Sequence, residues 1–141
     1  MAVRIVPYLV FGGNAREAIQ FYADVLDGRI EGILTFGDNP FPGMPEEAEN
    51  RVMHAQLTVG DSALFFSDTY PGQDHRPGNQ VTVTLLVDTV EQAERIYTAL
   101  AEGAQEIALP LQQTDWSPAY AQVTDKFGVP FQINTVPADQ A

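Results

Sequence analysis

An internal repeat restricts the possible folds of this chain more than any other feature. The segment AREAIQFYADVLDG, Ala15–Gly28, has apolar residues at helical spacing and ends at a glycine. Asn14 precedes it and is a plausible helix cap. The segment VEQAERIYTALAEG, Val90–Gly103, repeats this pattern about 75 residues later. Superposing the segments aligns Ala18 with Ala93, Tyr22 with Tyr97 and Gly28 with Gly103, which indicates two copies of one structural unit.

Strand-like runs surround both helical segments. VRIVPYLVF precedes the first helix and VTVTLLV precedes the second. Three further strands are expected after each helix, at Arg29–Phe36, Arg51–Val59, Ala63–Asp68, Ala104–Leu111, Ala119–Thr124 and Val129–Val136. Gly60-Asp61 and Phe127-Gly128 fall at the turns that join the last two strands of each set. The sequence therefore predicts an α+β fold of two βαβββ repeats, about residues 1–70 and 79–136, within one domain of residues 1–141.

The composition excludes several classes of partner. Asp and Glu number 19 against 7 Lys and Arg, so the formal net charge is -12. Nucleic acid phosphates and anionic membrane surfaces would repel such a chain, and we expect neither as a partner. Cys is absent, which excludes disulfides and thiolate chemistry. No apolar run approaches the roughly 20 residues that cross a bilayer, so we expect a cytoplasmic protein.

One face of the expected strands is polar and lacks Lys and Arg. Its side chains include His54 and Gln56, Thr82 and Thr84, Tyr120 and Gln122, and Gln132 and Asn134. A sheet that helices cover on one side can simply show such a face to water. Alternatively, the sheet is curved and mostly antiparallel, with helices on its convex side and a cup for a small molecule on its concave side. We favour the cup, because a solvated face would carry more long charged side chains.

The two halves differ mainly in one loop, GDNPFPGMPEEAE, at Gly37–Glu49. It is rich in proline, glycine and acidic residues, a composition typical of a surface loop. A lid over a pocket is the alternative interpretation.

The repeat and three motifs resemble the vicinal oxygen chelate superfamily, which includes glyoxalase I, extradiol dioxygenases, fosfomycin-resistance transferases and bleomycin-binding proteins. The motifs are PYLVFGGNAREAIQFY, MHAQLTVGDSALFFSD and TDWSPAYAQVTDKFGVPFQIN, and with the repeat they span nearly the whole chain. Within the superfamily the chain is most similar to the PhnB-like group. Members differ greatly in chemistry, so the resemblance implies the fold more firmly than the function.

The resemblance also implies where metal ligands would lie, on the first and last strands of each repeat. Those positions are Pro7, Phe66, Thr82 and Gln132. Proline and phenylalanine side chains cannot bind a metal, and a hydroxyl with one amide replaces imidazole and carboxylate poorly. We therefore expect no metal and no cofactor. Gln132 stands where a glyoxalase-type enzyme would carry its glutamate, and we expect it to hydrogen-bond a bound molecule or a neighbouring strand.

Catalysis would need another group. His75 lies in a turn-rich stretch where an exposed histidine is the default. His54 lies on the polar face, and Asp68, at the end of the neighbouring strand, has the matching parity. A His54–Asp68 pair is a weak candidate for a general base with its orienting group, or for a divalent metal site.

Aromatic residues favour binding over catalysis. Trp116, Tyr120 and Phe66 can stack on a planar or cationic ligand, as bleomycin-binding relatives do. The sequence thus favours a metal-free protein that binds a small organic molecule; a divalent-metal enzyme of glyoxalase or dioxygenase type and a non-catalytic interaction module are the alternatives. Relatives imply a homodimer. The expected ligand-binding residues are His54, Gln56, Phe66, Asp68, Thr82, Thr84, Trp116, Tyr120, Gln122, Gln132 and Asn134.

Overall fold

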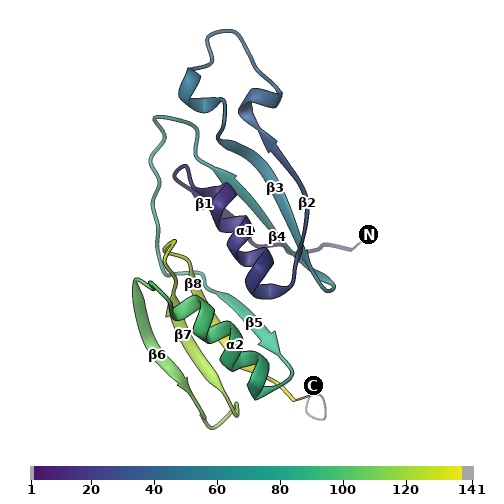
Figure 1. The fold of residues 1–141 in the computed structure, drawn as a ribbon, viewed down its shortest axis with the longest axis vertical. Helices are drawn as coiled ribbons and strands as arrows, with labels where there is room; N and C mark the ends of the chain where they lie inside the picture. Colours follow the sequence, from purple (N-terminus) through teal and green to yellow (C-terminus); the bar gives the residue numbers. More distant parts are fainter. Residues whose placement is uncertain (1, 138–141) are drawn as a thin grey trace. The chain divides into compact units, whose positions relative to one another are not determined.

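The structure, a computed structural model, describes residues 2–137 and divides after Arg76 into two compact units (Figure 1). The first unit contains β1 (Tyr8–Phe11), α1 (Ala15–Leu26), β2 (Arg29–Thr35), β3 (Val52–Val59) and β4 (Ser62–Asp68). The second contains β5 (Val83–Val87), α2 (Val90–Ala101), β6 (Glu106–Gln112), β7 (Tyr120–Thr124) and β8 (Pro130–Thr135). Two short 3₁₀ turns, Phe36–Asp38 and Glu46–Ala48, lie between β2 and β3. The predicted α+β fold of two βαβββ repeats is confirmed.

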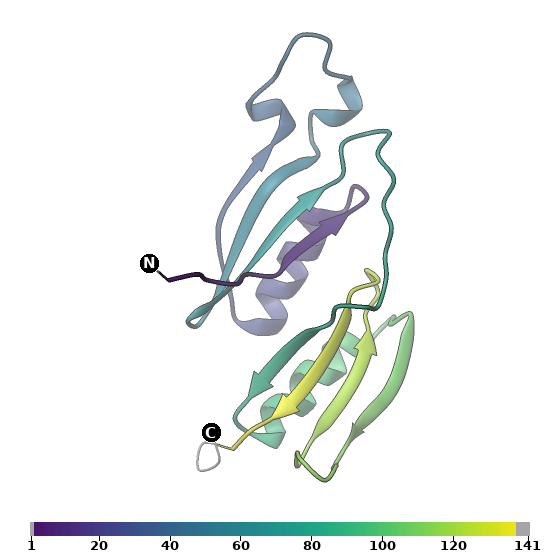
Figure 2. The same cartoon turned by 180° about the vertical axis from the view of Figure 1, so that it is seen from behind.

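Each unit is a four-stranded sheet with one helix on it. The strand orders are β1-β4-β3-β2 and β5-β8-β7-β6. β1 runs parallel to β4 and β5 runs parallel to β8, whereas the other neighbouring strands are antiparallel. Seen from behind, each sheet shows the face that its own helix leaves uncovered (Figure 2). We call this the open face of the unit.

The apolar stripe of each helix explains why it packs on its sheet. In α1 the buried positions are Ala15, Ala18, Ile19, Tyr22 and Val25, and in α2 they are Ala93, Ile96 and Leu100. This spacing follows the helical period, so the apolar side chains form one face of the helix. Packing on the sheet removes that face from water. The side chains beneath come from alternate strand positions, such as Leu57 and Phe66 in the first unit.

The end of α1 differs from the prediction. We expected Gly28 to adopt the conformation that terminates the helix, but Asp27 is the left-handed residue, with φ 53°. Gly28 is needed for space instead, because an added Cβ would lie 2.9 Å from Leu57 Cδ1 and 3.1 Å from the Thr58 carbonyl oxygen. Its hydrogen atom thus lets the helix end pass close to β3.

Asp68, and not Asn14, holds the start of α1. The Asn14 side chain makes no capping hydrogen bond. The buried Asp68 carboxylate accepts hydrogen bonds from the backbone N–H groups of Gly13, Ala15 and Val52, each at 2.9 Å. One side chain at the end of β4 therefore joins the helix start to β3, which satisfies donors that a helix start leaves unpaired.

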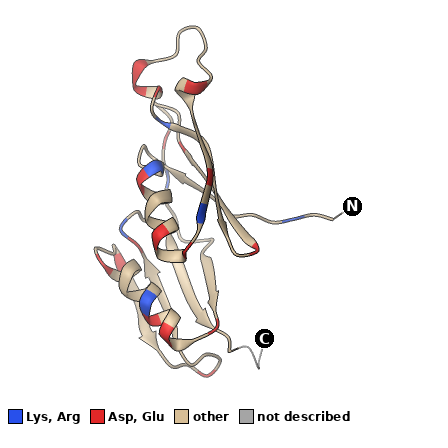
Figure 3. Ribbon diagram, turned by 45° about the vertical axis from the view of Figure 1, so that its right-hand side comes forward, with Lys and Arg blue, Asp and Glu red and all other residues tan. Residues whose placement is uncertain are grey.

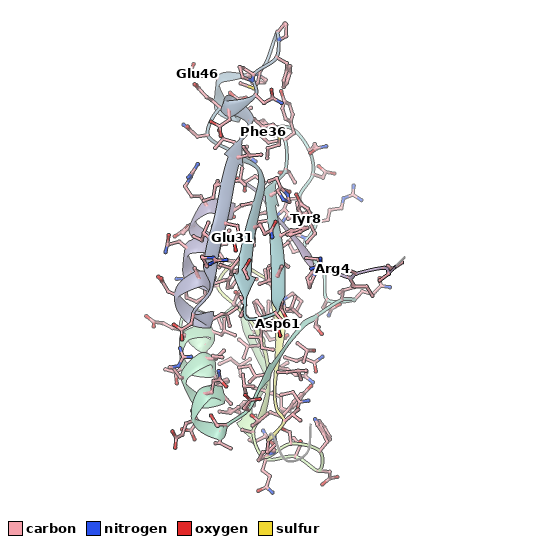
Figure 4. All side chains as sticks on the ribbon, turned by 90° about the vertical axis from the view of Figure 1, so that its right-hand side faces the viewer. Arg4, Tyr8, Glu31, Phe36, Glu46 and Asp61 are labelled. Atoms are coloured by element: carbon pink, nitrogen blue, oxygen red, sulfur yellow. The ribbon has the colours of Figure 1, made fainter. Side chains whose placement is uncertain are left out.

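The first strand of each unit is shorter than its apolar run. β1 begins at Tyr8 and β5 at Val83. Figure 4 shows the chain around Arg4 extending away from the sheet, and the side chains of Val3 and Ile5 are 90% and 93% exposed. The alternation of apolar residues did not predict where β1 and β5 begin. A strand also needs a neighbouring strand that forms hydrogen bonds with its backbone.

Charged residues lie on the helices, in the turns and on strands such as β2, whereas β5, β7 and β8 carry none (Figure 3). Among residues 2–137, no helix is long and apolar enough to cross a membrane.

We predict that Asp68→Ala lowers the free energy of unfolding by about 2–4 kcal/mol, because three buried N–H groups lose their acceptor. Chemical denaturation measures this change. Glu94→Ala removes an exposed carboxylate from α2 and serves as the control, with an expected change within about 0.5 kcal/mol. Equal effects of the two substitutions would contradict the role of Asp68.

Candidate functional site

The open face of the second unit gathers most of the polar residues singled out from the sequence. Tyr120 and Gln122 come from β7, and Gln132 and Asn134 from β8. In the antiparallel register Tyr120 lies opposite Asn134, and Gln122 lies opposite Gln132. The alternate residues Ala121, Val123, Phe131 and Ile133 are buried on the side of α2. The strand period therefore sends the amides and the phenol to one surface.

Both ends of the Gln132 amide are used within the protein. The Tyr120 hydroxyl donates a hydrogen bond to Gln132 Oε1. Gln132 Nε2 donates to Thr82 Oγ1 at 3.0 Å, just before β5 begins. Gln122 Nε2 donates to Tyr120 Oη at 3.1 Å. These four side chains, Thr82, Tyr120, Gln122 and Gln132, are uncharged, and we call them the amide network. They join β7 and β8 to the residue that precedes β5. Thr84 lies beside Gln132 in the parallel register and is exposed.

Trp116 extends this face with an exposed ring. The residue is 63% exposed, and its ring centroid lies 5.2 Å from that of Tyr120 in an edge-to-face contact. The loop that carries it is anchored by the buried Ser117, whose Oγ accepts from Thr135 N at 3.2 Å and lies 3.0 Å from the Ala119 carbonyl oxygen. The anchored loop thus presents a large aromatic surface next to the amide network.

The open face of the first unit has a different character. Tyr8 Oη and His54 Nδ1 lie 2.8 Å apart, within hydrogen-bonding distance. Phe65 packs edge-on against both rings, with centroids 5.9 Å from Tyr8 and 5.1 Å from His54. In Figure 4 the labelled Tyr8 lies on the side of the sheet away from α1. Gln56 lies opposite Phe65 on the same face.

The sequence did not identify Tyr8 and Phe65, although the β3–β4 turn contains a signal for Phe65. Val59 pairs with Ser62 across the two-residue turn Gly60-Asp61, whose glycine has φ 56°. From that turn the register follows by counting, and it places Phe65 opposite Gln56. Tyr8 lies next to Phe65 because β1 pairs with β4 in parallel. No short turn connects these two strands, so their register could not be counted from the sequence.

Two predicted placements are wrong by this register. Phe66 is fully buried on the side of α1, where its ring contacts Phe11 and Tyr22. Asp68 has the same parity and is 5% exposed, with both carboxylate oxygens bonded to backbone N–H groups. Neither lies on the open face, so the proposed His54–Asp68 pair does not form. His54 instead has Tyr8 as its partner.

The residues at the expected metal positions do not fit a divalent ion. The expected set is Pro7, Phe66, Thr82 and Gln132, and on the open face Phe65 lies where Phe66 was expected. Pro7 contributes its carbonyl oxygen to the sheet, at 3.0 Å from Phe65 N. The Gln132 oxygen accepts from Tyr120. Across residues 2–137, no three His, Asp or Glu side chains come together as ion ligands require. His75 Nε2 lies 2.8 Å from the Val10 carbonyl oxygen, a contact that anchors its loop.

The carboxylate near the first unit's open face is already paired. Glu31 accepts from Arg29 Nη2 at 2.8 Å and from Thr58 Oγ1 at 2.7 Å. The hydrogen bond from Arg29 and, second, that from Thr58 lower the pKa of Glu31 below its ordinary value. This pair is solvent-exposed and belongs to the strand surface, where ion pairs contribute little. Glu31 is labelled in Figure 4.

The loop between β2 and β3 is held at its base by aromatic contacts. The ring of Tyr70 lies 5.3 Å from that of Phe36 and 6.0 Å from that of Phe41. Asp38 accepts from Thr35 N at 2.9 Å, and this backbone hydrogen bond is the main cause that lowers the pKa of Asp38.

Comparison with known proteins shows that the chain matches one family model and is similar to several proteins along nearly its whole length. Residues 4–133 match the model of the Glyoxalase/Bleomycin resistance protein/Dioxygenase superfamily. Protein YjdN from Escherichia coli K12 is 33% identical over 143 residues, which cover 92% of this chain and 93% of YjdN. Protein PA1353 from Pseudomonas aeruginosa is 39% identical with a TM-score of 0.88, over 96% of this chain and 99% of that one. The PhnB protein from Bacillus cereus is 25% identical with a TM-score of 0.80, over 95% and 100% of the two chains.

We predict that Gln132→Leu lowers the free energy of unfolding by about 1–3 kcal/mol, because the largely buried Tyr120 hydroxyl loses its acceptor. Combined with Tyr120→Phe in a double-mutant cycle, it should show a coupling of about 0.5–1.5 kcal/mol. Gln56→Leu, the same change on the first unit's open face, is the control. Strictly additive effects of the two network substitutions would refute the hydrogen bond.

Proposed function

The chain belongs to the Glyoxalase/Bleomycin resistance protein/Dioxygenase superfamily, and we propose that it acts within it as a metal-free protein that binds a small organic molecule. The binding surface is the open face of the second unit, formed by the amide network and Trp116. The molecule lies against the exposed ring of Trp116, beside the buried Tyr120, and takes hydrogen bonds from neutral amides and hydroxyls.

The double use of the Gln132 amide is the observation that carries this proposal. A metal ligand at this position needs a free oxygen lone pair directed at the ion and companion ligands around it. Here the amide oxygen accepts from Tyr120 and the amide nitrogen donates to Thr82. A network held in this way is rigid and neutral, which suits the recognition of a polar organic molecule without chemistry on it.

The exposed indole of Trp116 and the charge of the chain indicate the chemical class of the ligand. A flat ring system can cover the exposed indole of Trp116 and remove apolar surface from water. No Lys or Arg occurs in β5, β7 or β8, and the chain carries a net charge of -12. An uncharged or cationic molecule therefore suits this surface better than an anion.

The Tyr8–His54 contact favours a second candidate function, acid–base chemistry on the open face of the first unit. An imidazole bonded to a phenol can exchange a proton with a bound molecule. Active imidazoles usually have a third group that orients them, and within residues 2–137 no carboxylate bonds to His54. Binding on the second unit is therefore the better-supported function.

We predict that a screen of flat heteroaromatic molecules, antibiotics included, yields compounds that raise the melting temperature and change the emission of Trp116. At a concentration of 100 Kd the stabilisation should be about 2.7 kcal/mol. Trp116→Ala and Gln132→Leu should remove most of it, whereas Gln56→Leu should leave it intact. A screen at saturating concentrations that never shifts the melting temperature would overturn the proposed function.

We further predict that Ni²⁺, Zn²⁺, Mn²⁺ and Fe²⁺ leave the melting temperature unchanged and that purified protein contains no stoichiometric metal. The physical reason is the lack of a suitable ligand set at Pro7, Phe65, Thr82 and Gln132. Elemental analysis and thermal scans measure both. A one-to-one metal whose stabilisation disappears in His54→Ala would instead favour a metalloenzyme with an unusual site.

A further inference from the structure

A side-chain oxygen on the second unit's open face has no hydrogen-bond partner. Asn134 Oδ1 is buried from solvent, and it bonds to no other group in residues 2–137. Asn134 lies opposite Tyr120 in the β7–β8 register and therefore borders the amide network. Buried polar atoms of folded proteins almost always have a partner, so an exception needs an explanation.

The neighbouring groups do not supply that partner. The Tyr120 hydroxyl has a single hydrogen, which it donates to Gln132 Oε1. Gln122 directs its amide nitrogen to Tyr120 Oη, and Gln132 directs its own to Thr82. Each of these donors has its acceptor within the network. The Asn134 carbonyl oxygen lies beside the network and accepts from none of them.

The position of the oxygen connects it with the aromatic surface. Tyr120 contacts the ring of Trp116, whose side chain is mostly exposed. A molecule that stacks on Trp116 therefore lies beside Tyr120, at the same end of β7 and β8 as Asn134. The oxygen is covered in the free protein, so a bound molecule reaches it only after a neighbouring side chain has moved.

Resting on the proposed function, we infer that the ligand carries a hydrogen-bond donor, an N–H or O–H group on a flat ring system, and that the Asn134 carbonyl accepts it beside Tyr120. The donor satisfies an oxygen that the free protein leaves unpaired. The ligand is thus recognised by an unpaired acceptor, Asn134 Oδ1, beside the exposed ring of Trp116. A flat molecule without a hydrogen-bond donor leaves this acceptor unpaired and binds less tightly.

Two probes of the same shape test this inference. Indole carries an N–H group, and benzofuran has an oxygen in its place. With the full ¹⁵N-labelled chain, NMR titration follows the side-chain amides of Asn134, Gln122 and Gln132 and the indole N–H of Trp116. We expect indole to bind about tenfold more tightly than benzofuran. Asn134→Leu, which keeps the size and removes the carbonyl, should abolish this preference, and Gln56→Leu should preserve it.

The free protein gives a second readout, which needs no ligand. Because Asn134→Leu removes a buried acceptor that has no partner, the variant should melt at a higher temperature than the parent chain. Asn134→Asp keeps an acceptor at the same place and should keep the preference for indole. A lower melting temperature for Asn134→Leu would show that the oxygen is already bonded in the free protein and would overturn the inference.

The outcomes separate this inference from the proposed function. Equal binding of the two probes would overturn the inference, since a water molecule would then satisfy the oxygen, while the binding surface would stand. A preference for benzofuran would show that the amide nitrogen faces the covered side, which also overturns it. If neither probe shifts any side-chain signal of the second unit, both the inference and the proposed function fail.

Discussion

The register of the hairpin that ends each unit decides which of its strand side chains face the helix and which lie on the open face. Strand side chains alternate between two faces, so a slip of one residue would exchange the buried set for the exposed set. In the first unit the turn at Gly60-Asp61 sets Gln56 opposite Phe65, and in the second the turn after Thr124 sets Gln122 opposite Gln132. The helix, the core and the open face all follow from these pairings. Asp68 reinforces the first register, because its carboxylate bonds at once to β3 and to the start of α1.

Equivalent positions in the two units have diverged in chemistry. Phe65 and Gln132 occupy the same place in their hairpins, yet one makes a ring cluster with Tyr8 and His54 and the other joins an amide network. Phe65 has no atom that can bind a metal, and Gln132 offers only a neutral amide, which is a weak ligand for a divalent ion. The duplicated fold thus provides two open faces with separate properties, one aromatic with the imidazole of His54 and one uncharged and rich in amides.

The sequence predicted the second unit's face better than the first unit's, and the difference has a physical cause. Gln132 and Tyr120 lie in strands whose polar and apolar residues alternate cleanly, so parity alone places them. In the first unit the run ALFFSD has two adjacent phenylalanines and ends in an aspartate. Hydrophobicity cannot tell which phenylalanine faces the helix, and a buried aspartate looks like a surface residue until its three backbone donors are known. The helix cap failed for a related reason, because Asp68 reaches the helix from another strand.

The sequence by itself determined the duplicated βαβββ order and the two amphipathic helices, because these depend on the local periodicity of apolar residues. Only the tertiary structure decided that Gln132 is bonded at both ends, that His54 meets Tyr8 and that Asn134 Oδ1 has no hydrogen-bond partner within residues 2–137. The first two depend on residues that lie in or beside different strands. Their distances depend on register and on parallel pairing, which one sequence does not encode locally.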